Sequence, residues 1–157
     1  ILAVGNQFNL RVNKIRDDLV NTASIFVIMP NTDQYVTELK VNLMSNKIAI
    51  ILPWETFALY SNTVDYLDVQ PVMHSMIVIP ALMYVFNELK EAREHLYNYE
   101  DYRWFRGIQK ACSKMDIIID YEGLESLDAL SVAQKLLDSP IVKAINYLGS
   151  GGDFDED

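Results

Sequence analysis

The chain has 157 residues and carries 22 acidic against 13 basic side chains, for a formal net charge of -9. This length suits a single domain with its own core, and the negative charge disfavours non-specific binding to nucleic acids or anionic membranes. The lone cysteine, Cys112, excludes an internal disulfide and a cysteine-based zinc site. A cytoplasmic location is the expectation.

The chain begins at Ile1 rather than Met, which is compatible with a fragment, a processed form or a chain whose disordered start is missing. The longest apolar run, Met76 to Phe86, is about half of the roughly 20 residues that a membrane-spanning helix requires. We therefore expect no transmembrane segment.

Three stretches in the first third of the chain predict strands. Phe8, Leu10 and Val12 alternate with polar residues over 7–13, the pattern of a strand with one buried face. Residues 24–29 form an apolar run that ends at Pro30, which suits a strand buried on both faces. Residues 35–52 alternate in the manner of a hairpin.

The hairpin pattern predicts its own register. With Ser45 and Asn46 as a two-residue loop, Val41 lies opposite Ile50. The same face then carries six aliphatic residues, which are Leu39, Val41, Leu43, Ile48, Ile50 and Leu52. A shift by one residue would place these aliphatic residues opposite polar ones, so the pattern favours this pairing alone.

A long helix over Pro71 to Asn98 is the expected centre of the fold. Its first half is apolar on nearly every side and its second half is charged along one face, so the first turns are expected inside the protein. Pro80 removes one backbone hydrogen bond and is expected to bend the helix near Met76. The alternative is that 72–79 forms a strand or a separate helix. A short helix is also expected from Pro53, with Glu55 in its first turn.

Helices are expected over most of the remaining chain. A second helix spans 101–115, and 116–121 is either its end or a short strand. Ser126 is the expected cap of a helix over 127–138, and Ser139 that of a helix from Pro140 to Gly149. Residues 150–157 form an acidic tail that we expect to be disordered.

The predicted fold is therefore a single α+β domain over 1–149. Its antiparallel sheet, which includes the hairpin at about 35–52, packs against the long central helix and the C-terminal helical region.

A basic stripe is the most distinctive candidate site. Arg103, Arg106, Lys110 and Lys114 share one face of the predicted second helix, opposite an apolar face that carries Phe105, Ile108, Cys112 and Met115. Aromatic residues, including Tyr99, Tyr102 and Trp104, crowd the start of that helix. These aromatic and basic residues together are the candidate partner-binding residues, with an ordinary solvated helix face and aromatic packing at a helix junction as the alternatives.

Other motifs carry weaker signals. Glu91 and His95 have a spacing that can hold a metal on a helix, but a solvated face with local ion pairing to Lys90 and Arg93 is the favoured interpretation. Asp33 with Glu38 and Lys40 resembles the acidic and lysine residues of metal-dependent restriction-type nucleases, although the Pro-Asp pairing of that family is absent.

The tail at 151–157 resembles the acidic, phenylalanine-bearing tails of single-stranded-DNA-binding proteins, which recruit partners, but it lacks their terminal Pro-Phe. A solubilising tail is the simpler interpretation.

These observations favour a non-enzymatic interaction or assembly module that binds another protein or a second copy of itself, with no cofactor and no metal. The first alternative is a nucleic-acid-associated protein that uses the basic stripe. The second is a metal-dependent hydrolase or nuclease that uses Glu38 or Glu91.

Overall fold

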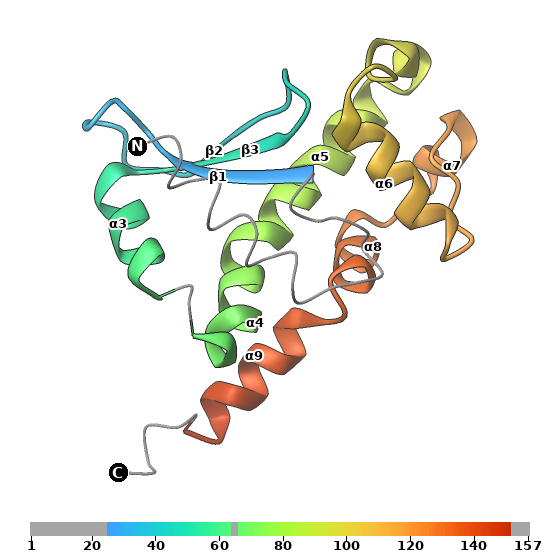
Figure 1. Cartoon of the computed structure of the whole chain (residues 1–157). Helices are drawn as coiled ribbons and strands as arrows, with labels where there is room; N and C mark the ends of the chain where they lie inside the picture. Colours follow the sequence, from blue (N-terminus) through green and yellow to red (C-terminus); the bar gives the residue numbers. More distant parts are fainter. Residues whose placement is uncertain (1–24, 64–65, 152–157) are drawn as a thin grey trace.

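The computed structural model describes residues 25–63 and 66–151 (Figure 1). Its sheet has the strand order β1-β3-β2, where β1 is Phe26–Pro30, β2 is Lys40–Asn42 and β3 is Ile48–Leu52. The predicted strand at 7–13 and the tail beyond Gly151 lie outside the described residues.

The sheet is mixed, so the expected antiparallel sheet is wrong for one of its two strand pairs. β3 pairs antiparallel with β2 but parallel with β1. The connection from β1 to β3 contains β2. Because β2 runs opposite to β1, it returns the chain to the end of the sheet where β1 begins, and β3 can then run parallel to β1. The apolar run of β1 is typical of a parallel strand, because such strands are usually covered on both faces.

The hairpin has the predicted register, with Val41 opposite Ile50. It is shorter than expected, because β2 covers only three residues and 35–39 is irregular. The turn is also wider than Ser45 and Asn46 alone, since residues 43–47 lie outside both strands. Four of the six predicted aliphatic residues are buried, and the remaining two, Leu39 and Val41, pack partly buried against the same core.

The long helix runs without interruption from Gln70 to Glu91 beside the sheet (Figure 1). It comprises α4 (Gln70–Met73), a π-helical turn η2 (His74–Val78) and α5 (Ile79–Glu91). The expectation of one helix through Pro80 is therefore confirmed, and the alternative of a separate element at 72–79 is wrong.

Pro80 accounts for the π-helical turn. Its nitrogen has no hydrogen to donate to Met76, one turn earlier, and its ring crowds that turn. The wider turn relieves this crowding, and Ile79 donates to the carbonyl of His74 five residues back.

The helix ends earlier than predicted. Ala92 leaves the helical conformation with φ -100° and ψ 19°, and a 3₁₀ segment, η3 (Arg93–Asn98), follows with a kink at His95. The Gln70–Glu91 helix is nevertheless long and apolar enough to cross a membrane by length and composition alone. Half of its most apolar window is buried inside the protein, as in the core helix of a soluble protein.

The remaining helices are, in chain order, α3 (Trp54–Thr63), η1 (Leu67–Val69), α6 (Arg103–Ser113), α7 (Tyr121–Glu125), α8 (Ala129–Leu136) and α9 (Pro140–Gly149). The predicted helices after Pro53, over 101–115 and over 140–149 are confirmed with small shifts at their ends. α5 packs against α8, and α9 packs against α4.

Two caps differ from the predicted ones. α8 begins after Asp128, whose side chain accepts a hydrogen bond from Ser131, so Ser126 is not its cap. Ser139 precedes α9 as predicted, but it adopts a left-handed conformation with φ 54° and its side chain makes no capping bond.

The stretch 116–121 is neither the end of α6 nor a strand. Residues 116–120 form a loop in which Asp116 has φ 62°. Tyr121 begins the unpredicted α7, which Asp120 caps by accepting from the backbone nitrogen of Gly123.

Candidate functional site

α6 presents the predicted basic stripe to solvent. Arg103, Arg106, Lys110 and Lys114 are all exposed, whereas Phe105, Ile108 and Cys112 on the opposite face are buried in the core. The helix comes close to the start of β1 at Gly107, where a β-carbon would lie 2.9 Å from Ile25 Cδ1. The amphipathic pattern therefore positions the four cations on one outward face.

The turn of the hairpin holds the N-terminus of α6. Asn46 Oδ1 accepts a hydrogen bond from the backbone nitrogen of Arg103 at 3.0 Å, and the Asn46 carbonyl accepts from Trp104 N at 3.1 Å. Asn46 thus caps a helix that begins 57 residues later in the chain. Residues 43–47 form a wide turn that offers these acceptors to α6.

The aromatic residues before the stripe pack against each other. Trp104 is fully buried, and its ring lies 5.7 Å from Tyr99 and 6.1 Å from Tyr102, measured between centroids. Its Nε1 donates to the carbonyl of Leu43 at 3.1 Å. Trp104 therefore anchors α6 to the hairpin and is not part of the surface that a partner would meet.

Tyr99 and Tyr102 are partly exposed at the edge of this aromatic cluster. Burial raises the pKa of the Tyr99 hydroxyl, with a smaller contribution from the nearby Glu88 carboxylate. Both tyrosines border the stripe, and packing holds them in place.

The stripe is largely without internal charge partners. Arg106 donates to the carbonyl oxygen of Glu100 at 2.8 Å. Within residues 25–63 and 66–151, the ion pairs are Lys40 with Glu38 and Lys143 with Asp138, and neither involves the stripe. All four cations of the stripe thus face solvent without a carboxylate partner among the described residues, in a chain of net charge -9.

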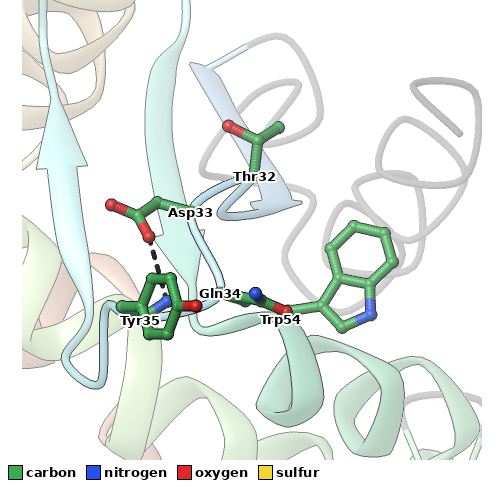
Figure 2. Close-up of a pocket in the computed structure, with 5 residues that line it drawn as sticks. All are labelled: Thr32, Asp33, Gln34, Tyr35 and Trp54. Atoms are coloured by element: carbon green, nitrogen blue, oxygen red, sulfur yellow. Dashed lines mark hydrogen bonds between the residues drawn. The ribbon is translucent and has the colours of Figure 1, made fainter.

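A cavity is the second candidate feature. It lies where the parallel strands β1 and β3 end, a position at which α/β proteins often bind ligands. A cavity of about 400 Å³ is lined by residues 32–35 and Trp54. Figure 2 shows the Tyr35 and Trp54 side chains on opposite sides of Gln34. Sequence reasoning missed this cavity, because the turn residues after Pro30 are the only local signal.

The side chains of Asn31 and Asp33 form hydrogen bonds within the loop that lines this cavity. Asp33 Oδ1 accepts from the Tyr35 backbone nitrogen at 2.9 Å, and Asn31 Oδ1 accepts from Asp33 N at the same distance. The cavity itself is open to solvent.

The candidate metal residues do not come together. α5 ends at Glu91 and His95 lies in the following kink, so the helical spacing that would join them is lost. Glu38 pairs with Lys40 on the surface. No group of three metal-ligating side chains occurs within the part of the chain that the structure describes.

Cys112 is not poised as a nucleophile. Its side chain is fully buried, and burial raises the pKa of the thiol to about 12, so the reactive thiolate is scarce near neutral pH. Cys112 is a small apolar residue of the core, as its place on the inner face of α6 predicts.

The described residues therefore offer a well-defined charged surface on α6 and an open cavity at the ends of β1 and β3. No family model, curated protein or solved structure matches this chain, and its function has to be inferred from these features.

Proposed function

We propose that this chain is a non-enzymatic interaction module, which binds an acidic segment of another protein through the exposed face of α6. The observation that supports this proposal is the set of α6 cations that lack a carboxylate partner among the described residues. A partner with several carboxylates would supply the missing counter-charges.

Geometry favours recognition at this face. α6 is held at its start by Asn46 and along its length by a buried face, so the stripe is presented on a rigid support. Each exposed ion pair contributes little, about 0.2–1 kcal/mol. Affinity would therefore come from several pairs together and would fall as salt screens them.

A protein partner is favoured over a nucleic acid. The overall negative charge opposes a phosphate backbone, and the burial of Trp104 removes the largest ring on which a base could stack. A cytoplasmic location and self-association through this face belong to the same proposal.

The direct test uses a fluorescent peptide rich in Asp and Glu and measures its anisotropy with the full chain at low and high salt. We expect saturable, salt-sensitive binding that is lost when Arg103, Arg106 and Lys110 are all changed to Glu. The matched control changes Lys40, Lys135 and Lys143 to Glu, which alters net charge equally but leaves α6 intact.

Equal loss of binding in the two variants would show a net-charge effect and would refute a site on α6. A single-stranded oligonucleotide is the second probe. Tighter binding of the oligonucleotide than of the peptide, lost in the α6 variant alone, would favour the nucleic-acid alternative.

A further inference from the structure

Two exposed aromatic rings border the cavity at the ends of β1 and β3. Trp54 is 47% exposed and Tyr35 is 83% exposed, and no aromatic ring of the described residues packs against either one. Tryptophan is usually well covered in folded proteins, as Trp104 is in this one. A tryptophan left half uncovered beside a cavity is therefore a candidate contact for a ligand.

Trp54 borders a second hollow as well. This hollow, of about 310 Å³, is lined by residues 34, 36, 37 and 53–56, and it shares Gln34 and Trp54 with the 400 Å³ cavity. The rings of Tyr35 and Trp54 lie on opposite sides of Gln34 (Figure 2). Residues 32–37 and 53–56 thus form one extended surface, the strand-end surface, which suits a chain-like ligand better than a single compact group.

Hydrogen bonds within the protein hold the strand-end surface in place. Asn31 N donates to the Leu52 carbonyl at 2.7 Å, which ties the loop after β1 to the end of β3. Asp33 Oδ1 accepts from Tyr35 N at 2.9 Å, and the Asp33 carbonyl accepts from Val36 N at 3.2 Å. A ligand therefore meets a backbone that is already ordered, which lowers the entropic cost of binding.

The lining of this surface disfavours two classes of ligand. Among the described residues it carries the carboxylates of Asp33 and Glu55 and no lysine or arginine, so phosphates and other anions are repelled. Its aliphatic part is limited to Val36 and Pro53, and both hollows are open to solvent. A purely apolar ligand would therefore bury too little surface to be held.

Hydrogen-bond donors separate the two remaining classes, which are organic cations and neutral molecules rich in hydroxyl groups. The Gln34 amide, the Trp54 indole nitrogen and the threonine hydroxyls of the lining can all donate, and a cation offers no acceptor to them. A hydroxyl group both donates and accepts, so it can bond to these groups and to the carboxylates alike. The rings suit the same class, because the weakly positive C–H groups of a sugar ring pack well on the negative face of an aromatic ring.

We propose that the strand-end surface binds a neutral oligosaccharide. Sugar rings stack on Trp54 and Tyr35, and their hydroxyl groups bond to the Gln34 amide and the Asp33 carboxylate. Because every contact is open to water, the expected affinity is weak, in the millimolar range. The surface is separate from the basic stripe of α6, so this site and the proposed protein-binding site can be tested independently.

NMR titration of the full chain tests the proposal. The probes are hexamers of glucose in α- and in β-linkage, of mannose and of N-acetylglucosamine, each at millimolar concentrations. We expect at least one hexamer to shift the amide signals of 32–35 and the indole N–H signal of Trp54 in a saturable way. The buried indole of Trp104 is the internal reference and should not respond. The affinity should not depend on salt, because no ion pair forms, and the matching single sugar should bind about tenfold more weakly, because it reaches one ring at a time.

Variants of Trp54 show whether its ring is the contact. Trp54→Ala is expected to weaken binding about tenfold or more, whereas Trp54→Phe keeps an aromatic face and should stay within about threefold. The matched control is Tyr97→Ala, because Tyr97 is an exposed tyrosine of η3 that lines neither hollow. This control and the variant with Arg103, Arg106 and Lys110 changed to Glu should both bind the oligosaccharide like the unaltered chain.

The proposal is overturned if none of the hexamers shifts the signals of 32–35, or if Trp54→Ala binds as well as the unaltered chain. Tetramethylammonium chloride is the competing probe. Shifts at the same residues by this cation, weakened by added sodium chloride and without any response to the oligosaccharides, would assign the surface to an organic cation instead.

Discussion

The cap that Asn46 provides for α6 can be removed with one substitution. Asn46→Ala deletes the acceptor 3.0 Å from the Arg103 backbone nitrogen but leaves the main-chain bond to Trp104. Loss of such a cap costs about 0.5–2 kcal/mol. Since Asn46 is exposed and water can replace part of the bond, we expect about 1 kcal/mol, or roughly 2–4 °C in Tm for a chain of this length.

Asn46→Asp separates the loss of the hydrogen-bond acceptor from other effects of changing the Asn46 side chain. A carboxylate keeps the acceptor and adds a negative charge at the positive end of the helix, which stabilises by about 0.3–1 kcal/mol. We therefore expect Asn46→Asp to be as stable as the unaltered chain, or more so, at neutral pH. Ser45→Ala is the control within the same turn, because Ser45 bonds only to the Lys47 carbonyl and its loss is expected to cost less than about 0.5 kcal/mol.

Urea unfolding followed by far-UV circular dichroism measures the free energy of unfolding of all three variants. Exchange at the Arg103 amide reports the cap locally and is expected to quicken in Asn46→Ala alone. The reasoning is refuted if Asn46→Ala leaves both quantities unchanged, or if Ser45→Ala destabilises the chain by the same amount.

Two further substitutions test the packing of the C-terminal half. A β-carbon on Gly123 would lie 1.9 Å from the carbonyl oxygen of Ile118, whereas one on Gly149 would meet nothing within 4 Å. In thermal unfolding we expect Gly123→Ala to lower the free energy of unfolding by about 2–4 kcal/mol, through overpacking and disturbance of the α7 cap. Gly149→Ala is expected to be neutral or stabilising by up to about 1 kcal/mol. Equal stability of the two variants would contradict the close approach of Gly123 to Ile118. Burial raises the pKa of the Cys112 thiol from 9.0, the value expected in the unfolded chain, to about 12 in the folded chain. Between these pH values only the unfolded state loses the proton, so the free energy of unfolding should fall as pH rises. The expected loss is about 1.4 kcal/mol between pH 8 and pH 10. Urea unfolding at the two pH values measures this loss. In Cys112→Ala the loss of stability between pH 8 and pH 10 should be smaller by about 1.4 kcal/mol. An equal loss in the variant and the unaltered chain would show that the thiol is not responsible.

Local patterns predicted much of the fold because they record which face of an element is buried. The alternation of Val41 and its neighbours was sufficient to predict the register with Ile50, since a one-residue shift would bury polar side chains. The spacing of basic and apolar residues likewise predicted the two faces of α6. Pro80 was correctly expected to disturb the long helix without ending it.

The candidate site was only partly predictable. The exposed cations followed from helical periodicity, but Trp104 was assigned to a binding surface and is buried. An aromatic residue beside an arginine fits either role, and its partner, the Leu43 carbonyl, lies 61 residues earlier in the chain. Residues 35–39 also alternate like a strand, yet the hydrogen bonds of Asn31 and Asp33 hold the preceding loop in another shape.

The sequence by itself determined the acidic character of the chain, the hairpin register, the long apolar helix and the amphipathic α6, because each depends on residues that are close together or on composition. Only the tertiary structure decided that β1 runs parallel to β3, that Asn46 caps α6 and that Trp104 faces inward. These features join segments far apart in the chain. Their stability comes from contacts and hydrogen bonds that form only when both segments are in place, and no local pattern records them.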